Sequence, residues 1–233
     1  MAQDAVLGLP HRNKKSAAAV VALTAMRLLL PVAAMLAALA AAQWGMGITI
    51  TALDGIFSGE TWLKPSQWLT AGHLLLALVF LAGNLASRRY GVPIAMLQII
   101  VSAVFAALFL AFVQAQPASP VSVAVASYLG DMPPMRLATA FAGALILALL
   151  FQAVIFEWTR GVQWWKAPLY GALWGAIVFG GAFYSAAFAG GAEPWLTRMM
   201  LHVGLLALCA FVALLPYWIL RALVRPLPGF GGY

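Results

Sequence analysis

Ten polar side chains interrupt otherwise apolar stretches of this sequence of 233 residues, and they are the first candidates for chemistry. They are His73, Asn84, Gln98, Ser102, Gln114, Thr139, Gln152, Tyr184, Ser185 and His202. None is a carboxylate, an amine or a guanidinium. Proton relays and ion-coupled carriers retain such charged groups inside the membrane despite their cost. The pattern therefore disfavours a pump, a proton-coupled carrier and a charged-ion channel.

The spacing of these residues assembles no catalytic centre. Hydrolysis inside a membrane needs paired carboxylates, a nucleophile with its base, or a metal site. The single cysteine, Cys209, lies within an apolar run, which is typical of a buried small side chain and excludes a disulfide or a Cys-based metal framework. The sequence therefore predicts no enzyme, no catalytic residue and no metal ligand.

Three polar residues suggest a ligand more directly than the others do. His73 and His202 are expected near the same end of their apolar runs, where facing histidines can hold a haem, a metal or a quinone. Without a supporting carboxylate, hydrogen bonding at the interface is the commoner role, so no cofactor is expected and haem or quinone binding stays an alternative. Gln98, at the middle of its run, could contact a neutral polar ligand, although hydrogen bonding between helices is commoner.

The composition shows which elements must position these residues. Hydrophobic residues make up 64% of the chain and charged residues 8%, against roughly 45–50% and about 25% in soluble domains. A bilayer core needs roughly 20 apolar residues in a helix, and lipid leaves the helix as the only backbone form for these runs. The sequence therefore predicts an all-α bundle of six transmembrane helices, which run from Leu28 to Ile48 (with residues 17–26 as an extension), Trp68 to Ser87, Val92 to Val113, Leu137 to Phe156, Ala167 to Ala189 and Met199 to Val224.

Basic residues predict the orientation. Ten lie before the first run, between runs two and three, between runs four and five, or at the end of run six. Only Lys64, Arg136 and Arg198 lie on the other side. The expected location is the inner (plasma) membrane of the cell. The positive-inside rule then predicts that both ends of the chain lie in the cytoplasm. A cleaved signal peptide is the alternative reading of the first run, although the run is longer than such segments usually are.

These predictions divide the chain into a cytoplasmic segment 1–16, a transmembrane domain 17–225 and a flexible tail 226–233. Basic residues at the ends of apolar runs indicate contact with lipid headgroups and not with nucleic acid. Gly171 and Gly175 have the spacing that lets two membrane helices approach closely. A short re-entrant or surface helix is expected between Val121 and Leu129.

Several segments, in order, resemble the vitamin uptake transporter family, whose best-known members carry queuosine precursors, the deazapurine bases. The segment Phe80 to Gly91 resembles the end of one family helix, and Arg136 to Ala140 the start of a later one. Trp164-Trp165 with Ala167-Pro168 and Gly175 resemble the next helix, and Leu215 to Tyr217 the last. The resemblance covers roughly residues 78–225 and implies a six-helix transporter.

The polar positions of that family differ here. The resemblance implies an acidic residue where the chain has Asn84, and Gln152 and His202 also stand where other polar groups are expected. Buried donors and acceptors that lose their partners cost about 1–3 kcal/mol each. A ligand of this chain is therefore expected to be less polar than a deazapurine base.

Two functional hypotheses remain at the level of sequence. The first is a transporter-like protein of the vitamin/queuosine-precursor uptake type for a small neutral heterocyclic ligand. Its expected ligand-binding residues are Asn84, Gln98, Gln152, Trp174, Tyr184 and His202. The second is a non-transporting accessory or assembly subunit, with a membrane-protein partner or a second copy of the chain packed against helices that are rich in small residues.

Overall fold

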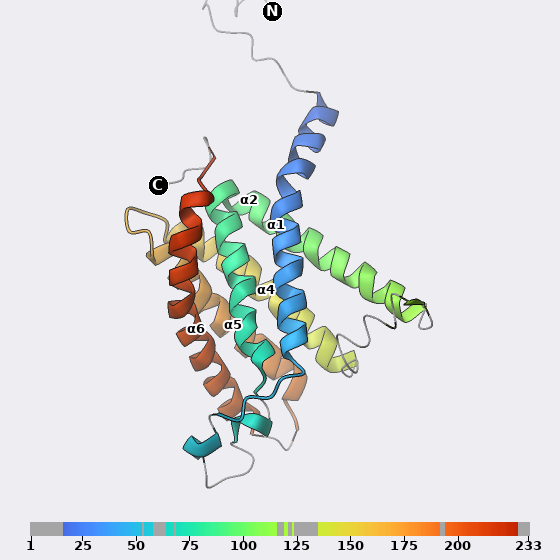
Figure 1. Ribbon diagram of the computed structural model, residues 1–233, viewed down its shortest axis with the longest axis vertical. Helices are drawn as coiled ribbons and strands as arrows, with labels where there is room; N and C mark the ends of the chain where they lie inside the picture. Colours follow the sequence, from blue (N-terminus) through green and yellow to red (C-terminus); the bar gives the residue numbers. More distant parts are fainter. Residues whose placement is uncertain are drawn as a thin grey trace, which may run out of the picture.

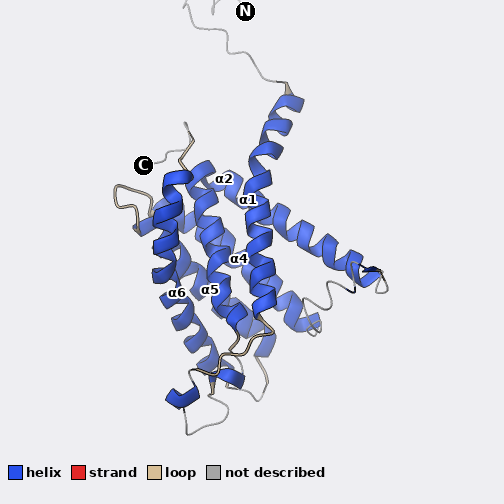
Figure 2. Ribbon diagram, in the orientation of Figure 1, coloured by secondary structure: helices blue, strands red, loops and turns tan. Residues whose placement is uncertain are grey.

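The protein is seen here in a computed structural model that describes residues 16–52, 54–57, 64–67, 69–115, 119–120, 123, 135–191 and 194–227. The described residues form five α-helices and no strand, as Figure 2 shows, which confirms the predicted all-α class. The helices are α1 (Ala17–Gly45), α2 (Ala71–Ala115), α4 (Met135–Trp158), α5 (Lys166–Phe188) and α6 (Trp195–Leu223). Each is long and apolar enough to cross a membrane.

Helix α2 is interrupted at Gly91. The backbone there has φ 73° and ψ 175°, a combination that is essentially restricted to glycine. Pro93 follows in the first turn of the second segment, where its missing N–H is tolerated. Residues 71–90 run beside α1, and residues 92–115, called the arm below, turn away from the bundle in Figure 1.

The described residues form five helices where six were predicted, because the second and third predicted runs are joined into α2 with a kink at Gly91. The sequence suggests a turn over Ser87 to Gly91 because two arginines and a glycine follow an apolar run. The helix instead continues through Arg88, Arg89 and Tyr90, and only Gly91 leaves it. The other predicted runs agree with α1, α4, α5 and α6 within a few residues, and α1 includes the predicted extension over residues 17–26. Nearly all of the surface helix expected at 121–129, and most of the segments 1–16 and 226–233, lie outside the described residues.

Helices α1 and α2 cross tightly at one end of the bundle. A Cβ at Gly45 would lie 2.6 Å from the backbone nitrogen of Gly72, and a Cβ at Gly72 would collide with the carbonyl oxygen of Ala42. The connection contains the 3₁₀ turns η1 (Asp54–Phe57) and η3 (Pro65–Gln67). The backbone N–H of Ser66 donates to Asp54 Oδ1 at 2.9 Å, and hydrogen bonds from the side chain and backbone of Ser66 lower the pKa of Asp54.

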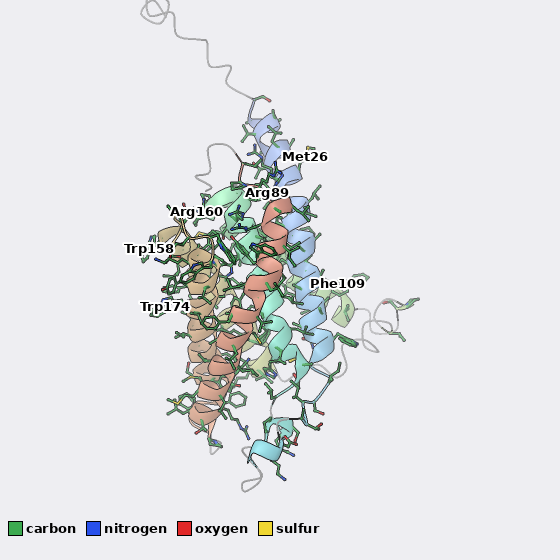
Figure 3. All side chains as sticks on the ribbon, turned by 60° about the vertical axis from the view of Figure 1, so that its left-hand side comes forward. Met26, Arg89, Phe109, Trp158, Arg160 and Trp174 are labelled. Atoms are coloured by element: carbon green, nitrogen blue, oxygen red, sulfur yellow. The ribbon has the colours of Figure 1, made fainter. Side chains whose placement is uncertain are left out.

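The core lies between α2, α4, α5 and α6, where Phe80, Leu149 and Phe179 are buried, and Met35 of α1 packs against it. Large apolar side chains also cover the outside, and Figure 3 shows Met26, Phe109 and Trp158 on outward faces. Their exposed fractions are 69%, 45% and 78%. Soluble monomers rarely expose such continuous apolar surface, so these outer faces fit contact with lipid.

Candidate ligand-binding site

Two amide side chains meet inside the bundle. Gln152 of α4 donates from Nε2 to Asn84 Oδ1 at 2.7 Å and to the carbonyl oxygen of Phe80 at 2.6 Å. Asn84 of α2 donates from Nδ2 to the carbonyl oxygen of Pro168, in the first turn of α5, at 3.0 Å. Asn84 is 3% exposed and Gln152 is 1% exposed. These two buried residues, called the amide pair below, connect three helices.

Glycines of α5 allow this approach. A Cβ at Gly171 would lie 3.2 Å from Asn84 Oδ1 and 3.3 Å from the carbonyl oxygen of Gln152. A Cβ at Gly175, one turn further on, would lie 3.0 Å from the ring of Phe80. The predicted small-residue spacing therefore has a specific use, because it brings the α5 backbone against the amide pair.

The amide pair retains one unused acceptor. Gln152 Oε1 is buried and has no hydrogen-bond partner. A narrow crevice between α2, α5 and α6 reaches Asn84 and is also lined by Phe80, Pro168 and Tyr217. The volume of the crevice is about 10 Å³, which is room for about one water molecule. A larger ligand would need these helices to separate.

Two of the other predicted site residues form a second polar cluster. The Tyr184 hydroxyl and His202 Nδ1 are 3.2 Å apart, and the His202 ring meets the His73 ring edge to face at a centroid separation of 4.7 Å. His73 Nδ1 accepts from the backbone N–H of Thr70 at 3.1 Å. His73 precedes Asn84 by eleven residues on α2, about 16 Å along a helix, so this cluster lies at a different depth from the amide pair.

The histidine cluster does not fit the alternative of haem binding between the two rings. Rings in direct contact leave no room for a porphyrin between them. Among the described residues, no group of three or more His, Cys, Asp or Glu side chains is placed to hold a metal ion. His202 Nε2 is buried without a partner.

The last two predicted residues lie elsewhere. Gln98 Nε2 donates to the carbonyl oxygen of Pro31 at 2.9 Å, so it connects the arm to α1. Trp174 is 47% exposed and meets the ring of Phe151, and Figure 3 shows it on the outside of the bundle. The structure therefore joins Asn84 with Gln152 and Tyr184 with His202, but it does not gather all six residues in one cavity.

Sequence reasoning missed three parts of this site. The carbonyl oxygens of Phe80 and Pro168 leave no signal in residue type. Tyr217 lines the crevice, although the sequence singles it out only within the resemblance at Leu215 to Tyr217. The sequence predicts Gly171 as a packing residue but does not show that it packs against a polar pair. The spacing of Gly171 and Gly175 is the only signal of this close contact.

Comparisons with family models, with curated proteins and with solved structures find no match to this chain. The class of the protein therefore follows from its own structure. Five long apolar helices with lipid-compatible outer faces define a multi-pass α-helical membrane protein.

Proposed function

We propose that the chain is a transporter-like membrane protein of the vitamin/queuosine-precursor uptake type, with a small neutral heterocycle as its ligand. The observation that carries this proposal is the amide pair: Asn84 lines the crevice, and its partner Gln152 has a buried acceptor, Oε1, without a hydrogen bond. A buried acceptor without a donor is costly. A ligand N–H that reaches it would remove that cost.

The chemistry of the surroundings favours a neutral and partly apolar ligand. The crevice is lined by the aromatic rings of Phe80 and Tyr217 and by alanine and leucine side chains, with Asn84 as its amide. An ion would lose its hydration there without a countercharge. A flat heterocycle could stack on a ring and present an N–H at its edge.

Entry of such a ligand requires motion, because the crevice now has room for about one water molecule. It lies between α6 on one side and α2 with α5 on the other. We propose that α6 moves away from Asn84 and Pro168 to admit the ligand, as gating helices do when a transporter alternates its access. The observed arrangement would then be a closed state.

The proposed topology has six crossings, with both ends in the cytoplasm of a bacterial-type inner (plasma) membrane. It treats residues 71–90 and the arm as two crossings joined at Gly91, and it follows from the distribution of basic residues. A reporter fused after Tyr233 should be active only in the cytoplasm. An engineered cysteine at Arg89 should resist an impermeant thiol reagent added to intact cells, and labelling there would contradict the topology.

Ligand binding can be tested with a thermal-shift screen of neutral nucleobases, pteridines and related vitamins on the purified protein. A ligand present at 100 times its Kd stabilises the folded state by about 2.7 kcal/mol. The shift should disappear in Gln152→Leu and persist in Trp174→Leu, since Trp174 lies outside. A shift that survives Gln152→Leu would exclude the amide pair as the site.

One observation, the exposure of the arm, favours the alternative hypothesis of an accessory subunit. Residues 104–112 of the arm, away from the bundle in Figure 1, are exposed on nearly every face. A partner helix could cover them. Purification in mild detergent should then recover a stoichiometric membrane partner, whereas a monodisperse single chain that binds a heterocycle would contradict this hypothesis.

A further inference from the structure

One end of the bundle, called the arginine end below, carries a strong excess of positive charge. Among the described residues of α2, α4, α5, α6 and the segments that follow them, it includes six cations and one carboxylate, Glu157. The cations are Arg88, Arg89, Arg160, Lys166, Arg221 and Arg225. Direct contacts hold several of them to this end: Arg88 Nε donates to the carbonyl oxygen of Val224 at 3.2 Å, and Arg89 donates to that of Arg225 at 3.2 Å.

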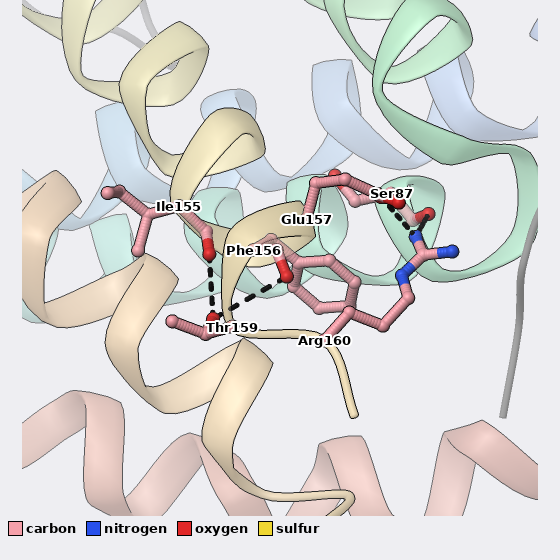
Figure 4. Close-up of polar contacts among 6 residues, drawn as sticks. All are labelled: Ser87, Ile155, Phe156, Glu157, Thr159 and Arg160. Carbon is pink, nitrogen blue, oxygen red and sulfur yellow. Dashed lines mark hydrogen bonds and ion pairs between the residues drawn. The ribbon is translucent and has the colours of Figure 1, made fainter. Parts of the chain in front are cut away.

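The single carboxylate compensates only part of this charge. Figure 4 shows Arg160 between Glu157 and the carbonyl oxygen of Ser87. Nη2 of Arg160 lies 2.9 Å from the Glu157 carboxylate and donates to the carbonyl oxygen of Ser87 at 2.6 Å. Carbonyl oxygens at helix ends satisfy guanidinium donors but carry no full charge. Among the described residues of this end, the cations therefore outnumber the carboxylates by five.

Two of these arginines face a common hollow. Arg88 and Arg160 line it together with Trp164 and Tyr217, between the end of residues 71–90, the α4–α5 connection and α6. Arg221 lies over the Trp164 ring, with its Cζ 4.8 Å from the ring centroid. The hollow itself, at about 20 Å³, has room for only one or two water molecules. A phosphate would therefore lie at its mouth, where guanidinium groups, which bind phosphate oxygens through N–H donors, lie beside aromatic side chains.

The surroundings favour a lipid as the source of that phosphate. Trp158 is 78% exposed and Val162 is 94% exposed, and both belong to the segment that borders the hollow. Exposed apolar residues beside cations at a helix end are typical of the level where headgroups meet acyl chains. A free phosphate ion would use the cations but not these apolar neighbours.

We propose that the hollow at the arginine end binds the phosphate headgroup of an acidic phospholipid. Arg88 and Arg160 contact the phosphate oxygens, Trp164 packs against the glycerol region, and the acyl chains follow the outer face of the bundle near Trp158. This site shares Tyr217 with the crevice that reaches Asn84, but it involves neither amide side chain and does not depend on the proposed transport function.

Native mass spectrometry of the full-length protein with added phosphatidylglycerol, cardiolipin or phosphatidylcholine tests this assignment. The acidic lipids should remain bound at activation energies that remove phosphatidylcholine, and their binding should weaken as salt rises. Each cation near an anionic lipid surface contributes about 1 kcal/mol, or about fivefold in affinity. Arg88→Gln with Arg160→Gln should therefore weaken acidic-lipid binding by about 30-fold.

Arg136 provides the matched control. It also donates to carbonyl oxygens at a helix end, those of Ala186 and Ala189 at 3.1 and 3.3 Å, but it lies outside the hollow. Arg136→Gln should leave acidic-lipid binding unchanged. Equal losses in the Arg136 variant and the double variant would overturn the assignment.

Further measurements test the assignment if the double variant folds poorly. Arg88→Lys retains the charge and should retain at least a fifth of the affinity. Inorganic phosphate at millimolar concentration should not displace the bound lipid, and displacement would identify a site for a free anion instead. Equal affinity of the wild-type protein for phosphatidylcholine and phosphatidylglycerol would exclude the proposed headgroup site without any variant.

Discussion

Replacing Gln152 by leucine tests whether the amide pair is an energetic unit. The change removes the hydrogen bonds from Nε2 to the Phe80 carbonyl oxygen and to Asn84 Oδ1, at 2.6 and 2.7 Å. It leaves Asn84 Oδ1 buried with no donor from Gln152. Hydrogen bonds between membrane helices contribute about 0.6 kcal/mol on average and up to about 1.7, and a stranded buried acceptor costs about 1–3 kcal/mol. We therefore expect Gln152→Leu to reduce the free energy of unfolding by about 1–3 kcal/mol.

The double variant Asn84→Leu with Gln152→Leu tests whether the two amides stabilise the protein through their contact with each other. When both partners become apolar, no group of the pair is left without its partner, so the double variant should lose less stability than the two single variants added together. The difference should be about 0.6–1.7 kcal/mol, measured by reversible unfolding in mixed micelles. Single effects that add within about 0.5 kcal/mol would refute the coupling. Ser185→Ala combined with Gln152→Leu is the control and should be additive, since the Ser185 hydroxyl bonds only within α5, to Gly181 and Ala182.

Other substitutions test the fold and the boundary of the site. Gly91→Ala should destabilise the protein by about 1–3 kcal/mol, because its backbone conformation is nearly restricted to glycine. Gly181→Ala, in a helix with open space beside it, should be neutral or slightly stabilising in the same unfolding assay. Gly72→Ala should loosen the contact between α1 and α2, since the new Cβ meets the Ala42 carbonyl oxygen; faster proteolysis of the connection would show this. Trp174→Leu should leave ligand binding unchanged within twofold, and a tenfold loss would place the ligand on the outer face of α5.

The helices could be predicted from the sequence because the bilayer sets their length. A stretch of about 20 apolar residues has few alternatives in lipid, and the predicted runs agree with α1, α4, α5 and α6 within a few residues. The start of α6 was placed at Met199 and lies at Trp195, because Arg198 lowers the local hydropathy although the helix continues through it. The continuity at Arg88 to Tyr90 has the same cause, since charge ends an apolar run without ending the helix.

The arrangement of the site was harder to predict, because lipid is as apolar as the protein core. A helix in water shows its buried face by an apolar stripe, but a membrane helix is apolar all round. Trp174 and Phe179 are five residues apart on α5, and Trp174 is about half exposed while Phe179 is fully buried. The pairing of Asn84 with Gln152, 68 residues apart, depends on the rotation of two helices that no hydrophobic pattern reports. The glycines at 171 and 175 were the only local sign of that contact.

The most direct measurement of the central claim is uptake of radiolabelled neutral heterocycles into proteoliposomes that contain the wild-type protein or Gln152→Leu. The account predicts saturable uptake of at least one such compound by the wild-type protein and a reduction of tenfold or more in the folded Gln152→Leu variant. Absence of saturable uptake across a broad panel, or equal uptake by the two proteins, would contradict it.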